Sequence, residues 1–149
     1  KNISKKDFKK FHPSGNLGAQ LRTVEELMIT GSKIPFVNES LNMKKALQII
    51  SNKKLGTLIV QNSMKITTGI ITDGQIRRVN AMSNNLQDLS VKKVMTKNPI
   101  SINLDTLAEK ALSIMNAKKI TSLCVHKDKN KKKTVGILHI HNILQSNIH

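Results

Sequence analysis

The chain repeats itself, and this repeat constrains the fold more than any other feature. Five short stretches of the first half recur, in the same order, in the second half. The matching pairs are VEELM and VKKVM, KIPFV and NPISI, MKKALQII and AEKALSIM, KKLGTLIV and KKITSLCV, and GIITDGQI and GILHIHNI. Partners lie 65 to 67 residues apart, so only short loop insertions separate the copies. We therefore expect two similar units within the 149 residues.

Each copy has the pattern of a strand, a helix, two strands and a second helix. Apolar residues recur at helical spacing at Met43, Ala46, Leu47 and Ile50 in the first copy, and at Leu107, Ala108, Ala111, Leu112 and Met115 in the second. Asp105 precedes the second stripe, where it can cap the helix. The stretches TLIV and SLCV predict short buried strands, and TTGII and TVGIL predict the strands that follow them after polar loops.

The order of these elements predicts how the strands pair. A crossover helix favours parallel pairing of the two strands it joins, whereas the short loop before Gly69 or Gly136 permits an antiparallel neighbour. Each three-stranded sheet keeps one face uncovered, and two such faces can pack together. We expect an α/β (α+β) fold in which two β-α-β-β-α repeats pack about a pseudo-twofold axis, with a cleft between them.

The strong positive charge raises the possibility of a nucleic-acid partner. Lysine and arginine total 25 against 9 acidic residues, which gives a formal net charge of +16. Lysine outnumbers arginine 22 to 3, although arginine is the better reader of phosphates and guanine edges, and Phe8, Phe11 and Phe36 are the only aromatic rings. The densest lysine run, KDKNKKK at residues 127–133, reads as a solvated loop between strands. We expect no nucleic-acid partner, and keep this function as the least favoured alternative.

The sequence lacks the marks of a membrane or metal protein. No run of eighteen uncharged apolar residues occurs, and the first residues lack the apolar centre of a signal peptide, so we expect a cytoplasmic protein. Cys124 lies in an apolar stretch and reads as a buried thiol. His139 and His141 are two residues apart, but no third ligand lies nearby in the sequence. We expect neither a metal site nor a cofactor.

The repeated unit resembles the cystathionine-β-synthase-type (CBS) domain, whose pairs form Bateman modules that bind nucleotides in the cleft between copies. The resemblance runs from Val24 to the C-terminus and implies one domain at residues 24–88 and another at 89–149. More closely, the stretches VEELM, GSKIPFV, LGTLIV, GIITDGQIRR, VMTKNPI, KITSL and GILHIHNIL resemble the C-terminal half of bacterial arabinose-5-phosphate isomerases. In that family a sugar isomerase (SIS) domain precedes the CBS pair.

The leading segment fits the same family. DFKKFHPSGNLGAQL, residues 7–21, resembles the DFxxxHPGGxLGxxL segment that ends the SIS domain, which implies that residues 1–23 are the tail of that domain and a linker. His12 matches a histidine of the family's active site and is the only catalytic candidate. The rest of an isomerase site is missing, so we expect a fragment that is not catalytic by itself and that follows an upstream SIS domain.

The resemblance also names candidate ligand-binding residues. In CBS domains that bind adenosine nucleotides, the last strand ends in G-h-h-T/S-x-x-D, where the hydroxyl contacts phosphate and the Asp binds the ribose diol. The corresponding candidates in this chain are Thr72, Asp73, Gln75, His139, His141 and Asn142. Gln75 and Asn142 stand where the family has Asp, and His139 replaces the second hydroxyl. An alternative is that the glycine of each motif only allows a tight strand start and the helices only cap each half of the sandwich, with no ligand.

The resemblance implies a regulatory CBS pair of an arabinose-5-phosphate isomerase, which would interconvert ribulose 5-phosphate and arabinose 5-phosphate for the Kdo sugar of lipopolysaccharide or capsule. A free-standing nucleotide sensor is the main alternative. The expected ligand is a nucleotide or sugar nucleotide, and the two lost acids favour the acidic CMP-Kdo over AMP or ATP. We also expect a homo-oligomer, either a dimer or a tetramer.

Overall fold

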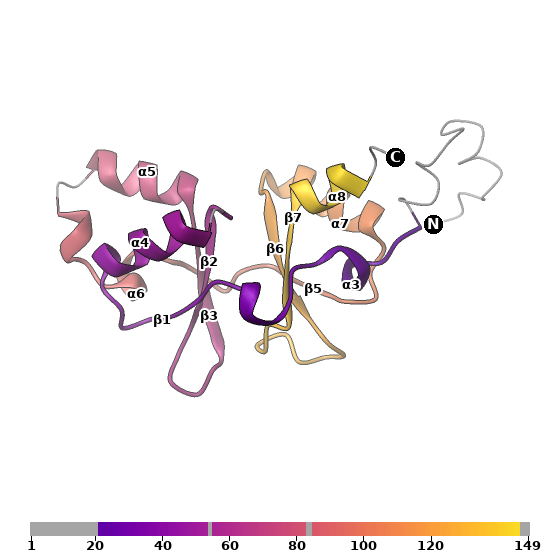
Figure 1. Cartoon of the computed structure of the whole chain (residues 1–149), viewed down its shortest axis with the longest axis horizontal. Helices are drawn as coiled ribbons and strands as arrows, with labels where there is room; N and C mark the ends of the chain where they lie inside the picture. The colour runs from indigo at the N-terminus through magenta and orange to yellow at the C-terminus, as the bar shows by residue number, and fades with distance from the viewer. Residues whose placement is uncertain (1–20, 54, 83–84, 147–149) are drawn as a thin grey trace.

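The computed structural model describes residues 21–53, 55–82 and 85–146, and Figure 1 shows their arrangement. The helices are α3 (Val24–Leu27), α4 (Met43–Lys53), α5 (Asp73–Met82), α6 (Val91–Val94), α7 (Ala108–Lys118) and α8 (Ile140–Ser146), with short 3₁₀ helices η1 (Gly31–Lys33) and η2 (Leu86–Asp88). The strands are β1 (Phe36–Asn38), β2 (Thr57–Gln61), β3 (Thr67–Thr72), β4 (Thr96–Lys97), β5 (Ser101–Asn103), β6 (Ser122–His126) and β7 (Gly136–His139).

The strands form two sheets of the same design. One sheet has the order β1-β2-β3-β4 and the other β5-β6-β7. In each sheet the first pair is parallel and the second antiparallel, with Thr57 opposite Thr72 and Ser122 opposite His139. The sheets lie beside each other in the middle of the molecule, with α4 and α5 outside one and α7 and α8 outside the other (Figure 1). The predicted α/β fold and strand pairing are therefore confirmed.

The long helices α4 and α7 bury the stripes that the sequence predicts. Met43 and Ala46 on α4 are buried, as are Ala111 and Met115 on α7. Burying a methionine side chain stabilises the fold by about 1.5–3 kcal/mol, so these stripes fix each helix on its sheet. The start of α7 differs from the prediction, because the helix begins one residue after Leu107, which is 43% exposed.

The cap of α7 also differs from the prediction. Leu107, rather than Asp105, occupies the N-cap position, and no side chain caps the helix there. The backbone N–H of Asp105 instead donates to the Asn103 Oδ1 atom in a turn that ends β5. Thr106 lies between Asp105 and the N-cap, so the turn places the carboxylate two residues too early to serve as a cap.

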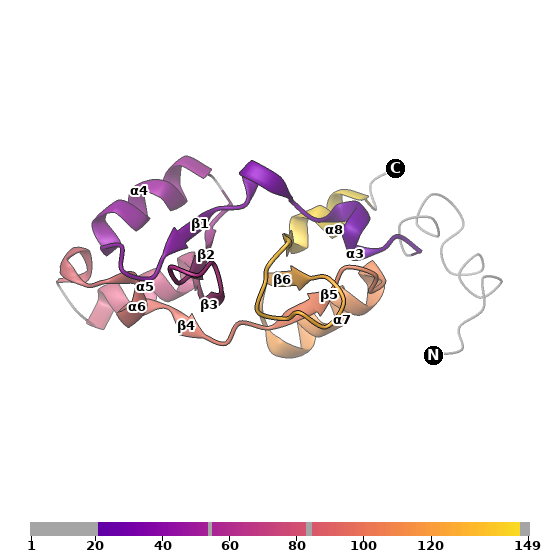
Figure 2. The ribbon, with the colours of Figure 1, turned by 90° about the horizontal axis from the view of Figure 1, so that it is seen from below.

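Each of the two short helices α3 and α6 packs on the half that is formed mainly by the other repeat. Val24 of α3 belongs to the core formed by α7, β6 and β7, whereas Val91 and Val94 of α6 belong to the core formed by α4, β2 and β3. The residues after each helix pair with a strand of the half on which that helix packs: Ile29 pairs with Ile137, and Thr96 pairs with Ile70. Seen from below, the segments from α3 to β1 and from β4 to β5 run between the halves on opposite sides (Figure 2). Each half is therefore completed by a helix that precedes the other repeat.

A third apolar core joins the two sheets. It contains Ile34, Ile59, Cys124 and Ile137. Ile59 and Cys124 occupy equivalent positions in KKLGTLIV and KKITSLCV, so equivalent residues of the two copies share one core. Burial raises the pKa of the Cys124 thiol to about 11, so this cysteine stays protonated and unreactive at neutral pH. This packing is the predicted pseudo-twofold arrangement.

Candidate ligand cleft between the two repeats

A cleft of about 460 Å³ lies between the two halves. The first half contributes the end of β3 and the start of α5, together with the segment that leads from β4 toward β5. The second half contributes the turn between α7 and β6 and the end of β7. Four of the six predicted ligand-binding residues line this cleft, namely Thr72, Asp73, Gln75 and His139, whereas His141 and Asn142 do not.

The first copy turns from β3 into α5 through a reciprocal pair of hydrogen bonds. The backbone N–H of Gln75 donates to Thr72 Oγ1, and the backbone N–H of Thr72 donates to Gln75 Oε1, each over 3.3 Å. This is a capping box, which the sequence TDGQ encodes by its Thr and Gln three residues apart. These hydrogen bonds fix the rotamer of the Thr72 side chain at the wall of the cleft.

The rest of the Gln75 side chain is bound by the protein as well. Its Nε2 atom donates to the Val94 carbonyl oxygen over 3.2 Å and also to the Thr96 hydroxyl. Gln75 thus ties the start of α5 to α6 and β4. Both ends of its amide are engaged within the protein, although the residue lines the cleft.

The second copy makes a similar but looser turn. Asn142 Oδ1 accepts a hydrogen bond from the His139 backbone N–H over 2.8 Å, and His139 Nδ1 accepts from the His141 N–H over 3.1 Å. The rings of His139 and His141 stack with their centroids 4.7 Å apart. Burial, together with the neighbouring His141, lowers the pKa of His139. His139 is therefore neutral at pH 7, with its ring proton on Nε2, because Nδ1 is an acceptor.

Positive charge dominates the cleft. Arg77, Arg78 and Lys119 line it, against the single carboxylate of Asp73. A Cβ atom at Gly74 would lie 3.5 Å from a guanidinium nitrogen of Arg78 and 4.0 Å from one of Arg77, so both arginines reach back to the first turn of α5. The helix dipole adds further positive potential at this point. The cleft is thus suited to an anion.

Gly56 lies against the turn from β3 into α5, next to Asp73. Gly56 has a φ of 74°, and a Cβ atom there would lie 2.7 Å from Asp73 Oδ2. The Asp73 carboxylate therefore rests against the bare Cα of Gly56, and the Asp73 backbone N–H donates to the Gly56 carbonyl oxygen over 3.0 Å. A larger residue at position 56 would displace this carboxylate and adopt a strained backbone.

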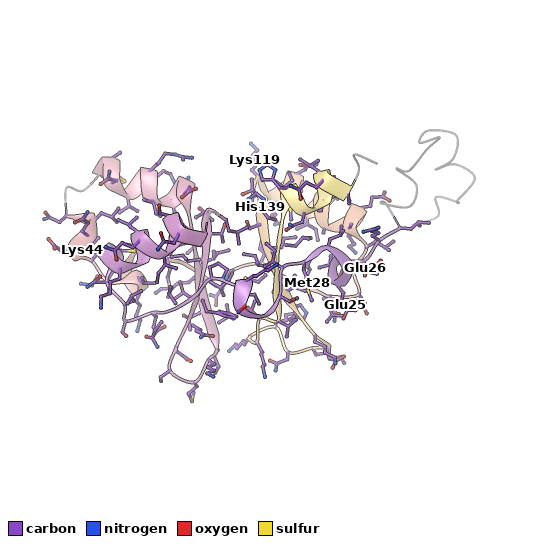
Figure 3. All side chains as sticks on the ribbon, viewed as in Figure 1. Glu25, Glu26, Met28, Lys44, Lys119 and His139 are labelled. Carbon is purple, nitrogen blue, oxygen red and sulfur yellow. The ribbon has the colours of Figure 1, made fainter. Side chains whose placement is uncertain are left out.

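Sequence reasoning missed several residues that line the cleft, among them two with a polar side chain and an unusual backbone. Lys119 lies in the turn after α7, and Asn98 lies in the segment between β4 and β5. Both have left-handed backbones, with φ of 58° and 51°, respectively. Neither belongs to the strand-to-helix motif, and each reaches the cleft only because the halves pack face to face. Figure 3 shows Lys119 and His139 at the same end of the second half.

Other expected features lie outside the cleft or outside the described residues. His12 falls in the segment 1–20, so the catalytic candidate is not placed. His126 is buried and shares a 2.6 Å hydrogen bond between its Nδ1 atom and Ser101 Oγ. Within residues 21–53, 55–82 and 85–146, no three His, Cys, Asp or Glu side chains group to hold a metal ion. None of the helices in these ranges is both long and apolar enough to cross a bilayer.

Known proteins with a similar sequence or structure point to one family. The sequence is 37% identical over 150 residues to the arabinose 5-phosphate isomerase KdsD of Salmonella typhimurium, an alignment that covers 99% of this chain and 44% of that protein. The chain thus spans less than half the length of the curated relatives it matches.

Two solved structures share the fold. A CBS-domain containing protein from Agrobacterium tumefaciens superposes with a TM-score of 0.78 at 18% identity, covering 87% of this chain and 96% of that one. The protein CBSX2, solved in complex with AMP, superposes with a TM-score of 0.71 at 23% identity, covering 83% and 94%. The family model for the CBS domain matches residues 24–81 and 91–148, one match in each copy of the repeat. The chain therefore belongs to the CBS-domain family and contains a tandem pair of these domains.

Proposed function

We propose that the chain is the ligand-binding regulatory part of an arabinose-5-phosphate isomerase. The similarity to the Salmonella isomerase extends over 99% of the chain, including the segment around His12. Aldose–ketose isomerisation moves a proton between neighbouring carbons, so it needs a general base and acid beside the sugar. His12 is the candidate for such a role, in combination with an upstream SIS domain. The CBS pair regulates that domain, and the whole enzyme is a homo-oligomer that acts in the cytoplasm.

The cationic cleft is the observation on which the ligand assignment rests. Arg77 and Arg78 reach back to the first turn of α5, where Gly74 leaves the backbone open, and Lys119 lines the same cleft from the other half. This arrangement favours a phosphate-containing ligand, since helix starts and guanidinium groups both stabilise anions. The AMP complex of CBSX2, which has the same fold, supports a nucleotide or a sugar nucleotide as the class of ligand.

The ligand is an acidic sugar nucleotide, with CMP-Kdo as the first candidate. Gln75 and Asn142 occupy the positions that hold Asp in adenosine-binding relatives, and both side chains already bond within the protein. Loss of a charge-assisted hydrogen bond to a ribose diol weakens binding by about 1–2 kcal/mol, or about tenfold. The uncharged amides also remove negative charge, so a ligand with a carboxylate is tolerated. Binding of the pathway's end product would provide feedback on the isomerase.

Calorimetric titration of this chain with CMP-Kdo, AMP and ATP tests the ligand assignment. We expect CMP-Kdo to bind more tightly than either adenosine nucleotide, and Thr72→Ala to weaken it. Arg77→Gln and Arg78→Gln should each weaken binding of CMP-Kdo as well. Arg22→Gln is the control, because Arg22 is the third arginine of the chain and does not line the cleft, and it should leave the affinity unchanged. Tight binding of ATP alone would favour the free-standing nucleotide sensor, and binding of none would favour a purely structural pair.

The link to the isomerase has its own test. The purified chain should not convert arabinose 5-phosphate, because a catalytic site needs residues from an SIS domain. The coding sequence ahead of residue 1 should encode that domain, and the longer protein should convert the sugar and respond to CMP-Kdo. Turnover by the chain alone, or an upstream sequence without an SIS domain, would refute this link.

A further inference from the structure

Lys119 has a backbone conformation that normally belongs to glycine. It terminates α7 with a φ of 58° and a ψ of 43°, and its N–H is directed to the carbonyl oxygens of Met115 and Asn116. Helices commonly end in this left-handed conformation, but the residue there is usually glycine and sometimes asparagine. A lysine gains nothing for the backbone, because its Cβ crowds the following carbonyl group. Lys65 adopts the same conformation away from the cleft, so the backbone alone assigns no role to Lys119, and the location of its side chain is the informative feature.

A favourable interaction with the helix dipole does not account for this lysine. Cations near a helix C-terminus are stabilising, but α7 already ends with Lys118 in its last turn. Lys118 occupies an ordinary helical position and supplies the same charge without the left-handed backbone. The feature that separates the two residues is their location, since Lys119 lines the cleft and Lys118 does not.

Across the cleft, Lys119 faces positive charge from the other half. Arg77 and Arg78 line the same cavity on α5. No ion pair of Lys119 with a carboxylate is found among the residues that the structure describes. Three cations around one cavity repel one another and outnumber the carboxylate of Asp73, so an anion bound between them relieves that repulsion.

We propose that Lys119 is an anion-binding residue of the cleft, contributed by the second half opposite Arg77 and Arg78. This role rests on the proposed function, because it assigns a contact to the same ligand. The ligand is then held by charges from both halves. Its affinity depends on the packing of the two repeats as well as on the strand-to-helix motif of the first.

Three substitutions at position 119 separate charge from backbone strain. Lys119→Gly removes the charge and suits the backbone, Lys119→Gln removes the charge only, and Lys119→Arg keeps the charge. Lys65→Gly is the matched control, because Lys65 has a φ of 62° in the turn between β2 and β3 and does not line the cleft. Each variant is titrated calorimetrically with CMP-Kdo and with ATP, and its thermal midpoint is measured without ligand.

We expect Lys119→Gly and Lys119→Gln to weaken binding of the tighter probe about tenfold, the effect of one charge-assisted hydrogen bond. Lys119→Arg and Lys65→Gly should bind within a factor of about two of the parent chain, well below that tenfold effect. Lys119→Gly should unfold at a midpoint no lower than the parent, so its weaker binding cannot reflect a damaged fold. If the parent binds and Lys119→Gln binds equally well, the role of Lys119 is wrong while the proposed function stands. If the parent binds neither probe, both fail.

Discussion

Thr57 and Ser122 form a hydrogen bond between their side-chain hydroxyls, 3.2 Å apart and buried between the two sheets. The two residues are equivalent, since Thr57 begins β2 and Ser122 begins β6, which are corresponding strands of the repeat. Thr67 and Thr134, a second equivalent pair, are joined in the same way over 2.6 Å. A residue can touch its own equivalent only near the pseudo-twofold axis. These two pairs therefore mark the axis, which passes between the members of each pair, and Ser122 also lines the cleft.

The Thr57–Ser122 pair should couple the stability of the two halves. Thr57→Val removes one hydroxyl and leaves the Ser122 hydroxyl buried without its partner, so we expect a loss of about 1–3 kcal/mol in unfolding free energy. Adding Ser122→Ala should restore part of that loss, because no unsatisfied group remains. Urea denaturation of both single variants and the double variant measures the coupling. Strict additivity of the single effects would contradict the pairing.

Gly69 and Gly136 should resist substitution because the crossing segments lie against them. A Cβ atom at Gly136 would lie 2.5 Å from Met28 Sδ and 3.1 Å from the Ile29 carbonyl oxygen, and one at Gly69 would lie 2.9 Å from the Thr96 carbonyl oxygen. We expect Gly→Ala at either site to lower the unfolding free energy by about 1–3 kcal/mol through overpacking. Gly74→Ala is the control, because its nearest contact would be 3.5 Å. Equal midpoints for all three variants in urea would rule out tight docking of these segments.

Gln75 and Asn142 should differ in their contribution to stability, although they are equivalent in the repeat. Gln75 bonds to Thr72, Val94 and Thr96, whereas the Asn142 side chain makes the single cap to His139. We expect Gln75→Ala to lower the unfolding free energy by about 1–3 kcal/mol and Asn142→Ala by about 1 kcal/mol or less. Thermal and urea unfolding of both variants give the comparison. A larger loss for Asn142→Ala would contradict the hydrogen bonds described for the first copy.

The chain should lose stability as the pH falls below about 6.5, the ordinary histidine value. Burial lowers the pKa of His139, with a further contribution from His141, and burial together with Lys131 lowers the pKa of His126. Because both folded pKa values are depressed, the unfolded chain binds more protons in this window, so the stability present above 6.5 is lost as the pH approaches the folded values. NMR titration of the ring protons measures each pKa directly. His139→Gln should flatten the pH dependence of the thermal midpoint, and an unchanged dependence would show that His139 does not contribute.

The sequence predicts much of this architecture because the informative patterns are local. Helical stripes such as Met43 with Ala46, and strands such as TLIV, depend on residues close together in the chain. The repeat then requires both halves to fold alike. The sequence does not predict that α3 and α6 pack on the half formed by the other repeat, because VEELM has the same local pattern whether it packs on its own repeat or on the other. Only contacts such as Val24 with the second core decide between the two.

The sequence predicts part of the candidate site, because that part is also encoded by residues close together in the chain. The motif positions Thr72 and Gln75 follow from one short stretch, and both line the cleft. Their hydrogen bonds to each other follow from the capping-box spacing, but the bonds from Gln75 to Val94 and Thr96 depend on the crossing of α6. Lys119 belongs to no sequence motif that would mark it as a ligand-binding residue. Its left-handed backbone and its place in the cleft arise from helix termination and packing between distant segments.

The direct test of ligand binding between the repeats is an NMR titration of the isotope-labelled chain with CMP-Kdo, followed through its backbone amides. We expect saturable shifts at Gly74, Asn98 and Thr121, which line the cleft from three separate segments, and none at Lys44 on the outer helix α4 (Figure 3). Shifts confined to the lysine-rich loop at residues 127–133, or no saturable shift at any amide, would contradict a ligand site in this cleft.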